Sequence, residues 1–394
     1  MQRILFIHQS SEIGGGSYCL LNVIKALDRS KFIPILVLKK TGPLVEEIKK
    51  LNVEIIIFNK LESILYNEAL LKPKNSLRYL HIMFSISAFK SMLKSNKIDI
   101  VYINNMMLYR YLKPAKESGC KTIMHVREHW PLNEHIIQLS WARKMVHKYC
   151  DQLIAINNYS ASIFPEKESS IVYDWIDMDS RFEDYPLSKV FGENMSDKKV
   201  FLFTGGIQPI KGALQVLRAF VDEIKDPSAR LLCIGLNPII ETTSLRGKIK
   251  RILASLGYYT YNWEVKKVMD SDSRIKNIPA TYMITHIMQQ CFCNLSYFTI
   301  PHANLAMAEA EILGLPTVAA LNEEALEYSL NGKNAVLFEA NNYREFVRAI
   351  ETIQINYQRY KDVLRDTHTV IAEMFSKQKN TLLLNQVISR VAQR

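Results

Sequence analysis

The chain has 394 residues, of which 48% are hydrophobic and 23% charged, and its formal net charge at pH 7 is +11. This length suits two globular domains, and no apolar run reaches the roughly 18 residues of a membrane-spanning helix, so we expect none. The positive charge favours acidic partners such as nucleic acid, an anionic membrane or phosphorylated small molecules, without choosing among them.

The N-terminal apolar run, residues 1–8, is too short for a signal peptide, and no small-residue cleavage site follows it. We interpret it as a buried strand and expect the protein to act in the cytoplasm. The six cysteines include no CxxC pair and the nine histidines show no metal-binding spacing. Disulfides and zinc are therefore not expected.

Short runs rich in Val, Ile, Leu and Phe alternate with helical patterns along the whole chain. The predicted strands are 3–8, 32–38, 53–58, 99–104, 122–126, 152–156 and 170–173, then 200–204, 230–234, 274–278, 292–297, 316–320 and 335–338. Continuous apolar strands separated by helices indicate parallel sheets covered on both faces. We predict an α/β fold with two Rossmann-like, doubly wound domains facing each other across a cleft. The predicted boundaries are 1–178, an interdomain connection at 179–199, 200–370, and a C-terminal helix at 371–394 that packs back on the first domain.

Glycines follow the first predicted strand of each domain. Gly15 and Gly16 precede a helix, where glycine lets the backbone approach a phosphate or a sugar, although a plain tight turn is the alternative. The dinucleotide fingerprint fails at Cys19, which disfavours a nicotinamide cofactor. In the second domain, Gly205 and Gly206 are followed by Lys211 at a helix start, a combination that suits a diphosphate.

The segment 301–319 reads PHANLAMAEAEILGLPTVA. It resembles the E-P-F-G-x-x-x-x-E-A-x-x-x-G-x-P-V-V-A signature of GT-B glycosyltransferases, in particular the retaining family 4 (glycosyl transferases group 1). The segment 205–212 is similar to the G-R-L-x-x-x-K-G phosphate loop of that family. Residues 331–338 resemble its N-G-x-N-G-x-L-V hairpin, and residues 172–177 resemble its Y-N-G-V-D.

The resemblance implies a metal-independent, sugar-nucleotide-dependent transferase with its acceptor on the first domain and its donor on the second. In it, Glu309 holds the nucleotide ribose, and Lys211 with helix-terminal amides stabilises the departing diphosphate. Two family residues are absent, because Pro301 replaces the first glutamate and Gly206 an arginine; His302 is the conjectured substitute. The predicted donor-binding residues are Gly15, Gly16, Gly205, Gly206, Lys211, His302, Asn304, Leu305 and Glu309.

The loop that follows the strand at 122–126 concentrates a base, a cation and an acid. In relatives, the corresponding loop lies near the reacting sugar and the acceptor. We predict His125, Arg127, Glu128 and Lys211 as catalytic residues. For the three residues of the loop, capping of the next helix is the alternative.

Two DxD triplets, 177–179 and 270–272, do not follow buried strands, so we interpret them as solvated charges and expect no metal and no other cofactor. Segments 72–97 and 245–267 are basic, amphipathic and rich in aromatic residues. Such helices suit peripheral contact with an anionic membrane. Core helices with snorkelling lysines are the alternative.

The predicted function is sugar transfer from a nucleotide-diphosphate donor to a glycan or polyprenyl-linked acceptor in cell-surface polysaccharide biosynthesis. We expect it in the cytoplasm, at the inner face of the membrane, without nucleic acid as a partner. The alternatives are a nucleotide-sugar epimerase on the same scaffold and a non-catalytic member that binds a glycan or a partner subunit. A nucleic-acid-binding protein has only the pI of 9.2 in its favour.

Overall fold

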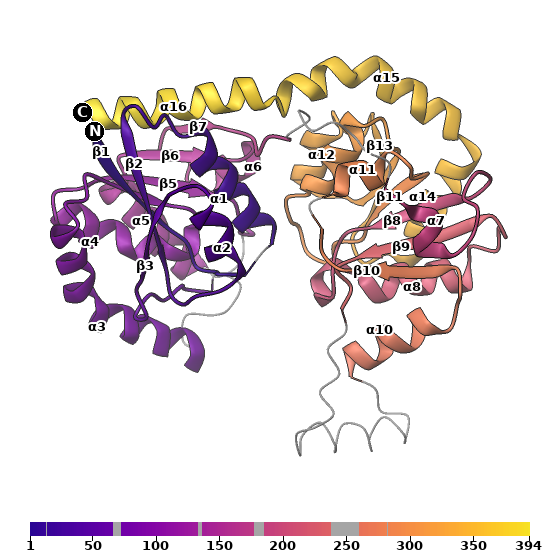
Figure 1. Ribbon diagram of the computed structural model, residues 1–394, viewed down its shortest axis with the longest axis horizontal. Helices are drawn as coiled ribbons and strands as arrows, with labels where there is room; N and C mark the ends of the chain where they lie inside the picture. Colours follow the sequence, from indigo (N-terminus) through magenta and orange to yellow (C-terminus); the bar gives the residue numbers. More distant parts are fainter. Residues whose placement is uncertain (13, 66–71, 133–135, 177–184, 238–259, 282) are drawn as a thin grey trace. The chain divides into compact units, whose positions relative to one another are not determined.

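The computed structural model describes residues 1–12, 14–65, 72–132, 136–176, 185–237, 260–281 and 283–394 (Figure 1). The chain divides into an N-terminal unit, Met1–Ile176 with Phe375–Arg394, and a C-terminal unit, Asp177–Met374. Each unit is a doubly wound α/β domain around one parallel sheet, which confirms the predicted fold class.

The N-terminal unit contains a seven-stranded parallel sheet of order β3-β2-β1-β4-β5-β6-β7. Its strands are β1 (Gln2–Ile7), β2 (Phe32–Leu38), β3 (Glu54–Ile57), β4 (Ile100–Ile103), β5 (Lys121–Val126), β6 (Gln152–Ala155) and β7 (Ser169–Ile171). All seven predicted strands are present, with small shifts at their ends. The strand order reverses between β1 and β4, so the loops after these strands lie at the switch point where such sheets bind ligands.

Helices cover both faces of this sheet. One face packs against α3 (Pro73–Ser95), α4 (Leu112–Glu117), α5 (Ile136–Tyr149) and α6 (Asn158–Ser162). The other packs against α1 (Gly15–Ala26), α2 (Pro43–Lys49) and the C-terminal helix α16 (Lys377–Gln393). The side chain of Gln2 donates to the carbonyl of Ala392, so the two ends of the chain lie together in this unit (Figure 1).

The C-terminal unit contains a six-stranded parallel sheet of order β10-β9-β8-β11-β12-β13. Its strands are β8 (Lys199–Phe203), β9 (Ala229–Ile234), β10 (Ile275–Ile278), β11 (Cys293–Ser296), β12 (Thr317–Ala320) and β13 (Ala335–Phe338). All six were predicted. The switch point lies between β8 and β11, the first strands of its two halves.

The helices of this unit also form two layers. Those on one face are α8 (Ala213–Asp222), α10 (Tyr261–Asp270) and α14 (Tyr343–Ile355). Those on the other are α7 (Leu187–Phe191), α11 (Ile284–Met288) and α12 (Leu305–Ile312). Helix α13 (Glu323–Tyr328) joins β12 to β13, and α15 (Tyr357–Met374) packs on α12 before the chain enters α16.

Two local predictions were wrong. Much of the predicted connection at 179–199 belongs to the C-terminal unit, because Leu187 and Phe191 of α7 are buried in its core and β8 begins at Lys199. The predicted hairpin at 331–338 is a turn followed by β13, which pairs with β12 in parallel. A parallel partner requires a crossover, here α13, so a hairpin cannot form at this position.

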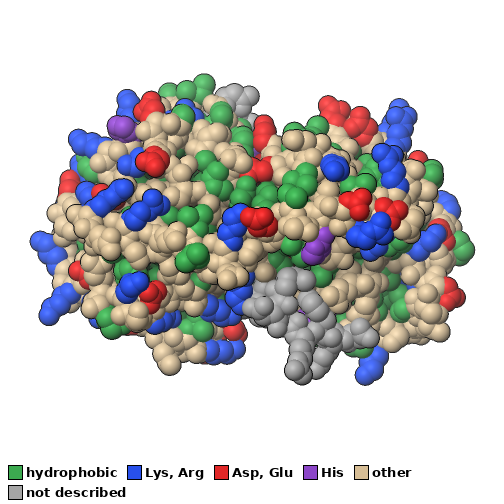
Figure 2. Space-filling model, turned by 90° about the horizontal axis from the view of Figure 1, so that it is seen from above, with side chains coloured by type: hydrophobic (Ala, Val, Ile, Leu, Met, Phe, Trp, Pro, Cys, Tyr) green, Lys and Arg blue, Asp and Glu red, His purple; other side chains and the backbone are tan. Residues whose placement is uncertain are grey.

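The surface carries both signs of charge. On the face drawn in Figure 2, Lys and Arg side chains are scattered over each unit, with Asp and Glu side chains among them. Among the helices that the structure describes, none has both the length and the apolar content needed to cross a bilayer.

Helix α16 provides a test of the fold. Leu384 is completely buried against the N-terminal unit, whereas Leu382 in the same helix is exposed. Leu384→Ala should lower the free energy of unfolding by about 2–5 kcal/mol, because it removes apolar contacts and leaves a cavity. Leu382→Ala should change it by less than about 0.5 kcal/mol. Urea unfolding followed by circular dichroism makes the comparison, and equal effects would contradict the docking of α16.

Candidate functional site

The loop after β8 is fixed against the loop after β11 by a glycine. Gly212 has φ +72°, and a Cβ atom there would lie 2.1 Å from the carbonyl oxygen of Tyr297. Next to this contact, the backbone N–H of Thr299 donates to the carbonyl of Ile210 at 2.9 Å. A side chain at position 212 cannot fit without separating the loops, so the sequence must place glycine here.

This contact positions Lys211, the last residue of a short 3-10 helix, η2 (Pro209–Lys211). Its ammonium lies 4.3 Å from the centroid of the Phe298 ring, a cation–π arrangement. Desolvation by burial lowers the pKa of Lys211 to about 8. No carboxylate in the described part of the chain forms an ion pair with it. The side chain is therefore a partly desolvated cation that suits an anionic ligand.

The two other glycines predicted in this loop also have backbone reasons to be glycine. A Cβ atom on Gly205 would lie 2.4 Å from the Phe203 ring, and Gly206 has φ +68°. The place of a Cβ on Gly206 is 3.5 Å from the carbonyl oxygen of Gly235, in the loop after β9. Gly205 thus lets its loop fold over the Phe203 ring, and Gly206 lets the same loop run close to the loop after β9.

Asn304 caps helix α12 at the same edge of the sheet. Its side-chain oxygen accepts from the backbone N–H of Met307 at 3.2 Å, and its amide nitrogen donates to the Ser296 hydroxyl at 2.8 Å. The capping residue thus ties the start of α12, Leu305, to the end of β11. In the structure the Asn304 side chain holds the helix terminus in place, and its contact with a donor stays a prediction.

Glu309 and Glu311 lie in very different surroundings on α12. Glu309 is half-buried, no residue that the structure describes hydrogen-bonds its carboxylate, and desolvation raises its pKa to about 7. Glu311 is completely buried, and its pKa is also raised by burial, although the nearby Asn334 lowers it. Glu309 is therefore the carboxylate of this helix that is available to a ligand.

His302, the conjectured substitute for an absent family residue, lies in the loop before this helix. Its ring packs against the Phe298 ring, with 5.3 Å between the ring centroids.

The switch point of the N-terminal unit contains two polar residues that the sequence analysis did not single out. His8 follows β1 and contacts the Ser17 hydroxyl at 3.0 Å and the Asn104 amide at 3.2 Å. Burial, with the charge of Arg127, lowers the pKa of His8 to about 3, so the imidazole is neutral. The sequence signal that could have identified these two residues, His8 and Asn104, was their position directly after β1 and β4.

Helix α1 begins in this polar cluster. Its N-cap residue is Gly14, which has no side chain to satisfy the first backbone N–H groups. A Cβ atom on Gly15 would meet nothing within 4 Å, and one on Gly16 would meet only the His8 ring at 4.0 Å. Gly15 and Gly16 thus leave space beside a positive helix end, unlike Gly205 and Gly212 of the C-terminal unit, where a Cβ atom would clash.

The structure brings the predicted residues His125, Arg127 and Glu128 together in a buried network. The Arg127 guanidinium forms an ion pair with Asp174 and donates to the Asn104 side chain at 3.3 Å. Burial lowers the pKa of Arg127, but the Asp174 carboxylate outweighs this effect and raises the pKa above its usual value. Asp174 was not predicted, although it lies in the segment that resembles Y-N-G-V-D.

His125 and Glu128 are buried members of this network, and both contact Arg127. The Nδ1 of His125 contacts the Tyr102 hydroxyl at 2.6 Å and the Arg127 guanidinium at 3.1 Å. Burial keeps the pKa of His125 well below 6.5. The Glu128 carboxylate accepts the backbone N–H groups of Met106 and Arg127, while burial raises its pKa to about 7. With 1% of its surface exposed, His125 contacts and positions Arg127, and its direct catalytic role stays a prediction.

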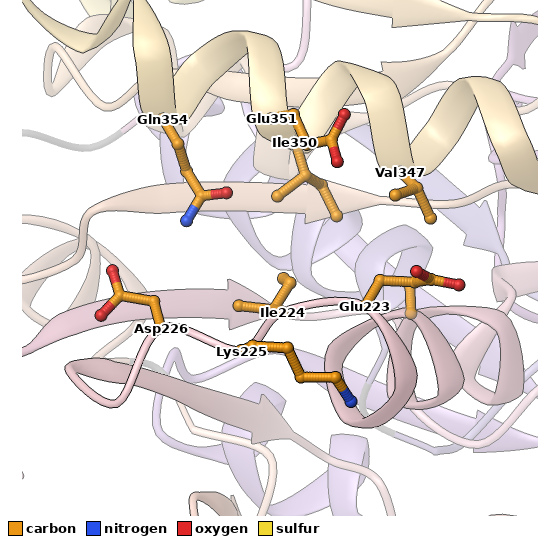
Figure 3. A pocket seen from close by; sticks show the side chains of 9 residues that line it. Glu223, Ile224, Lys225, Asp226, Val347, Ile350, Glu351 and Gln354 are labelled. Carbon is orange, nitrogen blue, oxygen red and sulfur yellow. The ribbon is translucent and has the colours of Figure 1, made fainter.

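Several other predicted features lie elsewhere. The triplet 177–179 and most of the basic segment 245–267 fall outside the described residues. In the second triplet, Asp270 pairs with Lys266 and Asp272 with Arg274. A surface pocket of about 230 Å³ lies between the ends of α8 and α14 (Figure 3). It includes Asp226, which pairs with Lys199 at the start of β8, so it lies at the opposite edge of the sheet from Lys211.

Solved structures share the fold of this chain over nearly their full length. Anabaena HepE in complex with UDP-glucose is 17% identical, with a TM-score of 0.73 over 99% of this chain and 100% of that chain. Sucrose-phosphate synthase from Thermosynechococcus elongatus is 12% identical, with a TM-score of 0.73 over 99% of each chain. A glycosyltransferase from Rickettsia africae is 14% identical, with a TM-score of 0.68 over 98% of each chain.

No family model matches the chain, and no curated protein matches it. At these identities the likeness defines the fold. The chain has the two-domain GT-B fold of glycosyltransferases.

Proposed function

We propose that the protein transfers a sugar from a nucleotide-diphosphate donor to a glycan or polyprenyl-linked acceptor, as a retaining transferase of the family 4 type. The observation that carries this proposal is Lys211, a cation at the switch point of the second sheet that forms no ion pair with any carboxylate among the described residues. Similar folds hold UDP-glucose. The proposed place of action is the cytoplasm, at the inner face of the membrane, in cell-surface polysaccharide synthesis.

The C-terminal unit supplies the groups for the donor. Lys211 and the backbone N–H groups at the start of α12 would stabilise the diphosphate as it departs. Glu309 would accept hydrogen bonds from the ribose hydroxyls. In the transfer, the bond from the anomeric carbon to the diphosphate oxygen breaks and a bond to the acceptor hydroxyl oxygen forms. The acceptor proton passes to the departing phosphate, so no protein nucleophile is required.

The N-terminal unit supplies polar groups of low net charge. The Arg127 charge is balanced by Asp174, and the His8 imidazole is neutral. Hydrogen-bonding groups of this kind suit sugar hydroxyls, and we propose the N–H groups at Gly15 and Gly16 as further donors of hydrogen bonds in this unit. Pro301 and Gly206, which replace two family residues, favour a non-catalytic glycan-binding protein as the second candidate.

Glu309→Ala tests the donor site. Loss of charge-assisted hydrogen bonds to ribose, each worth about 1.5–3 kcal/mol, should weaken UDP binding at least about tenfold. Glu351→Ala, on the exposed face of α14 beside the pocket in Figure 3, is the matched control and should bind UDP normally. Isothermal titration calorimetry measures both. Unchanged affinity in a folded Glu309→Ala protein would refute the assignment. An assay of sugar transfer to an acceptor distinguishes the candidates, because only the transferase would transfer the sugar, whereas the non-catalytic protein and the epimerase would not.

Affinity for a sugar nucleotide should be highest between about pH 7 and pH 8. Below the Glu309 pKa of about 7, protonation removes the ribose acceptor, and above the Lys211 pKa of about 8, deprotonation removes the cation. One linked proton changes the binding constant by up to about tenfold per pH unit. Lys211→Arg, whose guanidinium stays charged, should abolish the loss at high pH. A loss that is identical in both proteins would show that Lys211 does not contact the diphosphate.

Transfer should not require a divalent cation, since Asp270 and Asp272 are engaged by Lys266 and Arg274. Turnover is expected to persist in saturating EDTA. If EDTA abolished turnover and manganese restored it, the role given to Lys211 would have to pass to a metal.

A further inference from the structure

Helix α3 is apolar on two opposite faces. Its inner face, which includes Ile82 and Phe89, is buried in the core of the N-terminal unit. On its outer face, Leu77, Leu80 and Phe84 follow one another at helical spacing, and Phe84 is 80% exposed. An isolated exposed apolar residue needs no explanation, but a row of them on one helix face does.

A second exposed apolar group continues this surface on α5. Ile136, Ile137 and Trp141 are all exposed, Ile137 to 68%. The Trp141 ring contacts the Tyr79 ring of α3, 6.5 Å between centroids. The first turns of the two helices are also joined, because Asn75 and Gln138 both donate to the carbonyl of Leu65. We call this surface the α3–α5 patch, consisting of Leu77, Leu80, Met83, Phe84, Ile136, Ile137 and Trp141.

The charged side chains of the two helices have one sign. Neither α3 nor α5 contains an acidic residue. Exposed cations flank the apolar side chains on both helices: Lys72, Lys74, Lys144 and Lys148. An apolar centre with a basic rim and an interfacial Trp is the pattern of a helix surface that lies on an anionic bilayer.

From this geometry we infer that the α3–α5 patch docks the N-terminal unit on an anionic membrane surface. The inference rests on the proposed function, because a polyprenyl-linked acceptor lies in such a membrane. Both helices start at the carboxyl edge of the first sheet, the edge that holds His8 and Arg127, and α5 follows the loop that contains Arg127. Docking here would place the acceptor-side residues of this unit near the headgroups.

A second copy of the chain is the competing occupant of the patch. A symmetric pairing would place the same surface of each copy against the other. Lysines on both helices would then face lysines of the second copy, with no acidic residue on either helix to balance them. Charge complementarity therefore favours an anionic bilayer.

Vesicle sedimentation of the full chain tests this proposal, with vesicles of phosphatidylcholine alone and of equal parts phosphatidylcholine and phosphatidylglycerol. Leu80→Ser/Phe84→Ser should lower partitioning to the anionic vesicles at least about tenfold, because large apolar side chains leave the bilayer. Lys144→Gln/Lys148→Gln should lower it about thirtyfold, and only on anionic vesicles. Ile355→Ser, which changes an 82% exposed residue of the C-terminal unit, is the control and should bind normally.

The inference would be overturned if both double variants bound the vesicles as the wild type does, or if the wild type bound neutral and anionic vesicles equally. It would also be overturned if the wild type bound no vesicles but formed a dimer that Leu80→Ser/Phe84→Ser converted to a monomer. UDP affinity is measured in the same samples without vesicles. Failed sedimentation with intact UDP binding removes the docking surface alone. Failed UDP binding by the wild type removes the proposed function, whatever the vesicles show.

Discussion

The candidate donor site depends on the close approach of Gly212 to the Tyr297 carbonyl. This contact joins the loops after β8 and β11 across the switch point of the sheet, and it brings Lys211 over Phe298. A parallel sheet alone leaves those loops free to diverge, so the position of the cation is set by the absence of one Cβ atom. The Asn304 cap fixes the second loop at its other end.

In the N-terminal unit, the corresponding edge is organised by a buried ion pair. Removing Arg127 and Asp174 from water is costly, and their pairing recovers that cost only with further hydrogen bonds. Asn104 and His125 supply such bonds to the guanidinium. Arg127 is held from several sides, and it holds the polar groups that follow β4 and β5 in one network.

The fold could be predicted from the sequence because buried parallel strands are continuous apolar runs, and all thirteen predicted runs form strands. Helix α7 was missed because it has only five residues, too few to show a periodic pattern. The site was predicted less completely. Gly212 and Asp174 lie in segments that resemble family motifs, and His8 follows the first strand. Their roles, however, depend on contacts between segments distant in the chain, which local spacing does not specify. The capping role of Asn304 was not predicted, and its role in donor binding stays a prediction.

The two units handle charge in opposite ways, and this contrast supports the proposed division of labour. The C-terminal unit keeps the Lys211 ammonium half-buried with no carboxylate beside it among the described residues, an arrangement that an anionic ligand would stabilise. The N-terminal unit balances Arg127 with Asp174 and holds His8 neutral, so its edge offers hydrogen bonds without a large net field. A sugar nucleotide combines both kinds of group, because its doubly charged diphosphate links the nucleoside to an uncharged sugar. The cation of the C-terminal unit therefore suits a diphosphate leaving group, whereas the neutral network of the N-terminal unit suits uncharged hydroxyl groups.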